Sequence, residues 1–503
     1  MSKFVIRAIA AATVMWLPAM AFASGDAADY TRGVLIVNED WYGHQNSTVN
    51  HLTPNDPAGE YWHYRVIQAE NPGVELGCTN QYGAIWNGRV YFIAKQDKDP
   101  GASVAGGRIT VADAKTLKVL KQLRLIDPSG AQCDGRAFCG VSATKGYVSS
   151  SNGMWILDLE SLEIKGQVEG TANPNVDNGS DKPAADPTGS LYVGQTGTMM
   201  LAEGRVFAVH QQYGLLVIDP SADKVTDVLT MDIVDDAIEA DTGTRPKHPS
   251  GIGSTIVRAK DGSLWYSAAK NVQGTGATVP YIIRLDPVTL EREVVRITGD
   301  GIYPPSNSWY AWTPDPFCAS AKTNSLYWCG GENSWFTTYR VYRFDTDTRG
   351  IEKLLDFSSE PGDWHVYGCS LGVDPVSDEL YASVFHKVSD PTYVLRRYSA
   401  GGQLIREYPM ISNYWFPSMP LFPEAPANDA VTDADMTAVT IGCRGGILFV
   451  SGAEADVAEV YNLAGSCVAR CRLDEGVCRT RLDVAPGVYI VRAGADSRKI
   501  VVR

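Results

Sequence analysis

The chain has 503 residues, of which 44% are hydrophobic and 20% are charged, as is ordinary for a globular protein. Its formal net charge is −14 at pH 7. Nucleic acids and anionic membranes bind basic surfaces, so this charge argues against both as partners.

The first 23 residues predict a signal peptide. Lys3 and Arg7 precede an apolar core, and residues 21–23 form a small-x-small cleavage site. No cysteine follows the core where a bacterial lipoprotein carries its lipid anchor. No later segment approaches the roughly 20 apolar residues of a membrane-spanning helix. We therefore expect a protein without a transmembrane segment that is secreted or displayed on the outer cell surface.

A strand followed by a polar turn recurs seven times along the chain. The turns fall at Thr53, Asp113, Asp158, Asp219, Asp286, Asp345 and Tyr398. They are spaced by about 45 to 67 residues, and strand-forming segments fill the intervals. A repeat of this length that is built only from strands is typical of a propeller. We predict an all-β fold in which residues 30–423 form a seven-bladed β-propeller.

The first repeat lacks an innermost strand and starts directly at its second strand, residues 34–37. Residues 417–423, which follow the seventh repeat, are similar to the inner strand of that repeat. We predict that this segment pairs with the first repeat and closes the ring, because closure removes the open sheet edges of a propeller.

Residues 424–437 are rich in Pro, Ala, Asn and Asp and predict a linker. Residues 438–503 contain short strands and predict a small antiparallel β-sandwich, which is marginal in size on its own. Its four cysteines, Cys443, Cys467, Cys471 and Cys478, could staple it.

The cysteines of the propeller leave two alternatives. In an exported protein, Cys133 with Cys139 and Cys318 with Cys329 are candidate local disulfides. The alternative is that these four residues are reduced thiols buried in strands, and the sequence does not decide between the two.

The predicted strand order assigns every loop to one face of the propeller. One face carries short turns such as Asn87-Gly88 and Asp261-Gly262, whereas the other carries long loops rich in aromatic residues. Long loops on a rigid scaffold commonly carry function, and exposed aromatic clusters suit ring-bearing ligands, glycans and protein partners. The alternative is that these rings pack together and only order the loops.

We predict a ligand-binding site on this aromatic-rich face. Stacking would come from Trp41, Tyr42, Trp309, Trp312, Trp335, Trp364 and Trp415. Hydrogen bonds would come from His44, Asn46, Gln81, Gln195, Gln211 and His365, and Tyr82 completes the set.

The site is expected to be non-catalytic, and the sequence identifies no particular cofactor. The histidines lack metal-binding spacing, and the chain has neither a nucleophile elbow nor a P-loop. One alternative is a lyase or hydrolase that uses His248 or His365 with an acid at the central channel. Another is a protein-interaction platform without a small ligand.

Residues 30–423 resemble the YncE-like seven-bladed propellers. The resemblance lies in Val37-Asn38-Glu39-Asp40, in Gly194-Gln195-Thr196-Gly197, in Val206-Phe207-Ala208-Val209 and in the repeated strand-Asp-turn. Some relatives of that family capture cobalamin and other corrinoids beside an outer-membrane transporter. The resemblance therefore implies a corrinoid, or another large organic cofactor, as one candidate ligand class. That subgroup is lipid-anchored, a feature this chain does not share.

The C-terminal segment resembles the sorting domain of the type IX secretion system. The similarity lies in Tyr461-Asn462-Leu463-Ala464-Gly465, in residues 485–491 and in the basic final strand, residues 499–503. It implies export across an outer membrane, with the type IX secretion machinery as a partner. The four cysteines are unusual for such a domain.

Overall fold

The computed structural model describes residues 29–55, 61–175, 192–269, 278–305, 312, 314–331, 338–362, 364–387, 390–410, 417–423, 440–444, 446–451, 455–462, 465–473, 476–494 and 496–502. The predicted signal peptide (1–23) and linker (424–437) lie outside the described residues.

Seven four-stranded antiparallel sheets follow one another along residues 34–421. The first contains β28 (Pro417–Leu421), β1 (Val34–Asn38), β2 (Thr48–Thr53) and β3 (Tyr61–His63). The second contains β4 (Cys78–Trp86), β5 (Arg89–Gln96), β6 (Ile109–Asp113) and β7 (Val119–Leu123). The third contains β8 (Gly135–Gly140), β9 (Lys145–Ser150), β10 (Gly153–Asp158) and β11 (Glu163–Gln167).

The remaining four sheets repeat this order. The fourth contains β12 (Thr196–Ala202), β13 (Arg205–His210), β14 (Gly214–Asp219) and β15 (Lys224–Leu229). The fifth contains β16 (Gly251–Arg258), β17 (Leu264–Ala269), β18 (Thr278–Leu285) and β19 (Arg292–Arg296). The sixth contains β20 (Phe317–Ala319), β21 (Ser325–Gly330), β22 (Arg340–Asp345) and β23 (Ile351–Asp356). The seventh contains β24 (His365–Val373), β25 (Leu380–Lys387), β26 (Asp390–Tyr398) and β27 (Leu404–Pro409).

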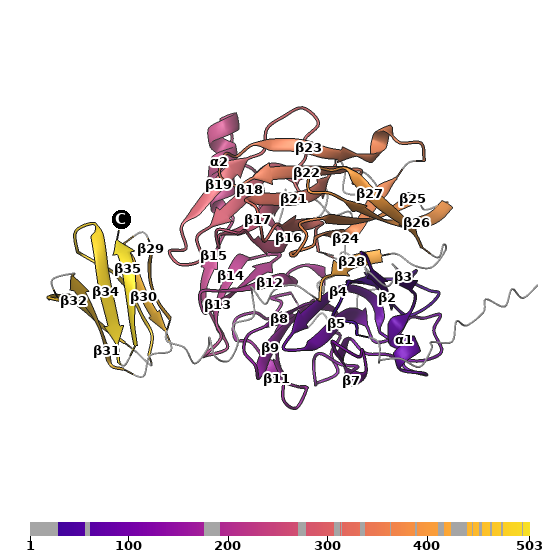
Figure 1. The fold of residues 1–503 in the computed structure, drawn as a ribbon, viewed down its shortest axis with the longest axis horizontal. Coiled ribbons are helices and arrows are strands. Elements are labelled where there is room, and N and C mark those ends of the chain that lie inside the picture. The colour runs from indigo at the N-terminus through magenta and orange to yellow at the C-terminus, as the bar shows by residue number, and fades with distance from the viewer. Residues whose placement is uncertain are drawn as a thin grey trace, which may run out of the picture.

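The sheets are the blades of a ring, and the first strand of each lies toward its centre. Figure 1 shows β4, β8, β12, β16, β24 and β28 around the middle of the molecule. The hydrophobic core sits between neighbouring blades: the ring of Tyr91 in the second blade stacks on Phe138 in the third, with 3.9 Å between centroids. Second strands are packed on both faces, which is why β13 is a continuous apolar run, Val206-Phe207-Ala208-Val209, with each side chain 0% exposed.

The predicted closure of the ring is confirmed. Strand β28 pairs antiparallel with β1, so that Leu421 lies opposite Leu35 and Pro420 opposite Ile36. The hydroxyl of Ser418 donates to the carbonyls of Val37 and Asn80 at 3.1 and 2.9 Å, and so joins the first and second blades. Proline is tolerated in β28 because β28 is the inner edge of its sheet.

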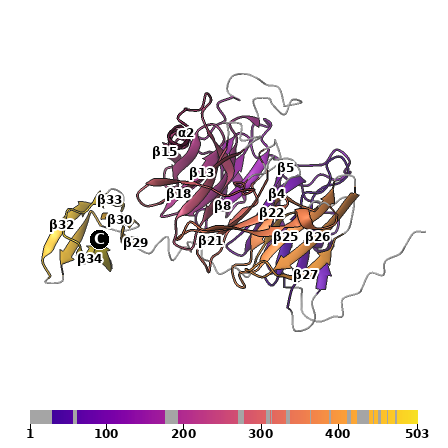
Figure 2. The same cartoon turned by 90° about the horizontal axis from the view of Figure 1, so that it is seen from above.

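The C-terminal residues form a small β-sandwich, as predicted. One sheet contains β29 (Thr440–Arg444), β30 (Ile447–Ser451) and β33 (Cys478–Arg481). The other contains β32 (Cys467–Arg472), β31 (Val457–Asn462), β34 (Gly487–Ala493) and β35 (Asp496–Val502). Leu448 and Val450 of the first sheet share a buried cluster with Val460 and Val491 of the second. Figures 1 and 2 show these strands as a body separate from the ring.

Short helices interrupt the blade connections, a feature that the sequence analysis did not predict. They are α1 (Val66–Glu70), α2 (Asp232–Thr242) and the 3-10 turn η2 (Phe357–Ser359). Helix α2 buries Val234 and packs Ile238 against the core between the fourth and fifth blades. It ends at Gly243, whose φ of 73° suits a residue without a side chain.

Of the two alternatives for the propeller cysteines, the structure has the free thiols: Cys133, Cys139, Cys318 and Cys329 are all unbonded. Cys139 lies in strand β8 and Cys133 two residues before it, and at roughly 3.3 Å per residue the extended chain keeps them beyond a disulfide's reach. The thiol of Cys133 instead contacts the Ser150 hydroxyl at 3.0 Å. In the C-terminal domain, Cys471 and Cys478 are bonded and connect the two sheets, as expected of a staple.

Candidate functional site

The β1–β2 loop turns its acidic residues inward and its aromatic residues outward. Glu39 and Asp40 are 6% and 2% exposed, whereas Trp41 and Tyr42 are 38% and 55% exposed. The His44 ring lies 4.5 Å from the Trp41 ring. Within the described ranges, Trp41 and Tyr42 are the only Trp, Tyr or Phe side chains that are exposed. We call Trp41, Tyr42 and His44 the aromatic arm.

Two buried side chains anchor the aromatic arm to the neighbouring blade. The Asp99 carboxylate accepts from the Gly43 backbone N–H at 2.8 Å. The Asn46 side chain accepts from the Asp99 backbone N–H and donates to the Val104 carbonyl, both at 2.8 Å. Asn46 was predicted as a ligand-binding residue, but its amide forms hydrogen bonds that hold two loops together. The arm is therefore displayed on an ordered backbone.

A buried carboxyl lies directly behind the arm. Neither carboxyl oxygen of Asp40 has a hydrogen-bond partner among the described residues, and the same holds for the side-chain nitrogen of Gln45. Burial raises the pKa of Asp40 well above its usual range, a rise that Gln45 and Thr48 only partly offset. Its unused hydrogen-bonding capacity is costly unless something else satisfies it.

Two cations are buried at the mouth of the central channel on the same face. Lys95 is the last residue but one of β5 and is 6% exposed, and Arg136 is the second residue of β8 and is 3% exposed. Burial and Arg136 lower the pKa of Lys95 to about 7, although Glu39 and Asp134 act in the opposite direction. The lysine thus sits within a group of charges of both signs.

Three of the predicted glutamines belong to this group of charges. The guanidinium of Arg136 donates to the side-chain oxygen of Gln195 at 2.9 and 2.5 Å. Gln195 in turn lies 3.4 Å from the Gln211 side chain, and Gln81 donates to the Glu39 carboxylate at 2.5 Å. The structure therefore brings Gln81, Gln195 and Gln211 together, but buries them at 4%, 0% and 1% exposure.

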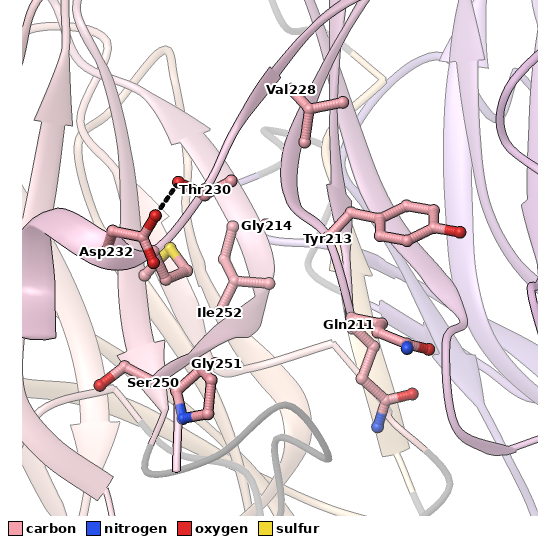
Figure 3. Close-up of a pocket in the computed structure, with 12 residues that line it drawn as sticks. Gln211, Tyr213, Gly214, Val228, Thr230, Asp232, Ser250, Gly251 and Ile252 are labelled. Carbon is pink, nitrogen blue, oxygen red and sulfur yellow. Dashed lines mark hydrogen bonds between the residues drawn. The ribbon is translucent and has the colours of Figure 1, made fainter. Parts of the chain in front are cut away.

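Gln211 also lines a pocket of about 220 Å³ between the fourth and fifth blades. Figure 3 shows Gln211 and Tyr213 on one side of it and Asp232 and Ser250 on the other. Thr230 donates to the Asp232 carboxylate at 3.0 Å across the pocket's upper edge.

The other described residues of the predicted site are used for packing. Trp312 is 3% exposed, and its ring lies against Gly197, where an added Cβ would come within 3.1 Å of Trp312 Cζ3. The ring of Trp364 stacks with the Arg396 guanidinium at 5.0 Å. His365 is 5% exposed among aromatic rings, and Tyr82 packs half-buried against the core, where burial raises its pKa.

The predicted residues Trp309, Trp335 and Trp415 lie outside the described residues. Of the remainder, only Trp41, Tyr42 and His44 form an exposed group. The sequence analysis missed Asp40, Lys95 and Arg136. A charge near the start of an inner strand or near the end of a second strand was the available signal, since both strand ends lie on the same face of the ring.

In the part of the chain that the structure describes, no three His, Cys, Asp or Glu side chains are close enough together to hold a metal ion. Over the same residues, every helix is too short or too polar to cross a bilayer.

These observations define a β-propeller that displays an aromatic arm on one face of the ring. The chain belongs to the DUF5074 family, described as a domain of unknown function, whose profile matches residues 32–423. No curated protein matches the chain.

Among solved structures, the chain is similar to the extracellular domain of BT4673 from B. thetaiotaomicron, named as a one component system. The identity is 14%, the TM-score 0.40, and the match covers 95% of this chain and 57% of that chain. It is similar to PorZ, a surface component of the type-IX secretion system of Porphyromonas gingivalis, at 12% identity and TM-score 0.41, over 97% and 61% of the two chains. The chain thus spans less than two thirds of both proteins.

A third similar structure is the β-propeller domain of Cps50 (Swd1) from Myceliophteria thermophila. The identity is 10% and the TM-score 0.39, over 69% of this chain and 92% of that one.

Proposed function

We propose that this protein is an exported, non-catalytic β-propeller that binds an organic ligand at the aromatic arm. The observation that carries the proposal is the exposure of Trp41 and Tyr42, at 38% and 55%, on a backbone anchored by Asp99 and Asn46. Large exposed aromatic side chains with neighbouring polar groups commonly mark binding sites.

The arm suits a ligand with a flat or ring-shaped apolar face and a hydrogen-bonding edge. Trp41 and Tyr42 offer ring faces for stacking, and His44 offers an exposed polar ring beside them. The carboxyl of Asp40 and the amide nitrogen of Gln45 lie behind the arm without hydrogen-bond partners among the described residues. Corrinoids, porphyrins and glycans all combine such a face with polar substituents, and the sequence resemblance puts corrinoids first.

The route to the surface and the division of the chain are part of the same proposal. Residues 1–23 would direct export, and residues 424–437 would connect the propeller of residues 30–423 to a sorting domain of residues 438–503. The small disulfide-linked sandwich supports a separate C-terminal unit. The type IX secretion machinery would then be a partner, and the protein would be secreted or held on the outer surface.

The test is a calorimetric titration of the purified chain with cyanocobalamin, haemin and a cello-oligosaccharide. We expect saturable 1:1 binding of one of them. The double variant W41A/Y42A should weaken that binding about 5- to 100-fold, because each stacked pair contributes about 0.5–1.5 kcal/mol beyond area burial.

A matched control is the double variant L404A/I405A, which removes two exposed apolar side chains from β27. It should bind as tightly as the wild type. If none of the three probes gives saturable heat, or if both double variants weaken binding equally, the proposal is wrong.

A further inference from the structure

The mouth of the channel on the face opposite the aromatic arm contains a cavity of about 680 Å³. Four inner strands end at its wall, β16 with Arg258, β20 with Ala319, β24 with Val373 and β28 with Leu421. Inner strands begin on the face that carries the arm, so their last residues meet on the other face. Figure 1 shows β16, β24 and β28 converging on the centre of the ring.

Most of the residues that line this cavity are apolar, although its surface exposes polar and apolar atoms to a similar extent. The closure strand and the residue after it contribute Met419, Pro420, Leu421 and Phe422, and the second blade adds Ile85. The volume falls within the range of about 300–1,000 Å³ that is typical of small-molecule sites, which are mostly apolar with a few polar groups.

The charges at the cavity have a single sign. Arg258 and Lys260 line it from the β16–β17 turn, and no acidic side chain is among the described residues that line it. Asp261 lies in the same turn, but its carboxylate accepts from the Ser263 N–H at 2.9 Å and from the Arg284 guanidinium at 3.1 Å. Arg258 already takes part in another interaction, so Lys260 is the cation that can meet the charge of a ligand here.

We infer that this cavity binds an anionic amphiphile, an aliphatic chain that ends in a carboxylate. The chain would lie against the side chains of Met419, Leu421 and Phe422, and the carboxylate would lie near Lys260. The inference is independent of the proposed function, because the aromatic arm lies on the opposite face of the ring.

The test is a calorimetric titration of the purified chain with decanoate, and with 1-decanol as the uncharged probe of equal chain length. We expect one saturable decanoate site per chain, and binding of 1-decanol weaker by about tenfold or more. K260E reverses the charge of an exposed residue, so that the fold is retained, and should weaken decanoate binding about fivefold or more.

The matched control is K247E, the same charge reversal at an exposed lysine that does not line the cavity. K247E and W41A/Y42A should both bind decanoate like the wild type. The inference is overturned if decanoate gives no saturable heat at millimolar concentration, if K260E has no effect, or if W41A/Y42A abolishes decanoate binding.

Discussion

Aromatic residues on the loop face are displayed in one arc of the ring and buried in another. In the first blade, Trp41 and Tyr42 point outward from a loop that Asn46 and Asp99 fix by hydrogen bonds. Trp312 lies in the connection between the fifth and sixth blades, is 3% exposed and forms part of the core between the fourth and fifth blades. A loop that is anchored by buried polar side chains can leave its rings free for a ligand, whereas the ring of Trp312 is taken up by packing.

The largest expected effect on stability comes from removing the buried aromatic ring of Trp312. Trp312→Ala should lower the free energy of unfolding by about 3–5 kcal/mol, because it empties a packed site. The backbone of Trp312 has a φ of 54°, an unfavourable conformation for a bulky residue that packing of the indole against Gly197 helps to maintain. Urea unfolding measures the loss, and a loss below about 1 kcal/mol would contradict the distinction between the two arcs.

His210 is another buried ring, and it should make the stability of the protein depend on pH. Burial lowers the pKa of this fully buried imidazole from 6.5 to about 3. Between these values the unfolded chain binds a proton that the folded chain does not, so the stability falls as the pH falls through this window. By about pH 4.5 the loss attributable to His210 should be about 2–3 kcal/mol.

The variant His210→Gln tests this pH dependence, because its side-chain oxygen can replace Nδ1 as the acceptor for the N–H groups of Gln212 and Tyr213, at 3.3 and 3.1 Å. Urea unfolding at pH 7 and at about pH 4.5 should show that H210Q loses about 2–3 kcal/mol less on acidification than the wild type. The matched control is H248Q, at an exposed histidine. Equal acid sensitivity of H210Q and the wild type would refute the prediction.

Most of the fold could be predicted from the sequence because propeller contacts repeat at a fixed period. Each blade buries apolar strands against the next, so the strand-turn repeat carries the architecture, and the missing inner strand indicated the closure by residues 417–421. Helix α2 was missed because it occupies a connection, where the repeat imposes no pattern.

The site was predicted only in part, because exposure in loops depends on contacts between residues far apart in the chain. The Gly43–Asp99 hydrogen bond that supports the aromatic arm spans 56 positions. The proximity of Arg136 to Gln195 spans 59 positions and likewise exists only once neighbouring blades have packed. Residue type could place Trp41 and Trp312 on one face, but not decide which of them reaches solvent.

The anchor of the aromatic arm is expected to have an intermediate effect. Asn46→Ala removes two hydrogen bonds and leaves the Asp99 N–H and the Val104 carbonyl without this partner, which should cost about 1–3 kcal/mol of stability. Ligand binding should weaken as well, since the arm would lose its ordered backbone. The exposed amide variant Q212A is the control, and binding by N46A that matches the wild type would argue against anchoring.

The smallest effect on stability belongs to the displayed rings themselves. Y42A and W41A should each change the free energy of unfolding by less than about 0.5 kcal/mol, because neither side chain is buried in the core. Urea unfolding of these two variants and of Trp312→Ala compares the loss of stability for exposed and buried aromatic rings. If W41A or Y42A instead lowers the free energy of unfolding by more than about 1 kcal/mol, that ring is packed as Trp312 is. The aromatic arm would then not be a surface for a ligand.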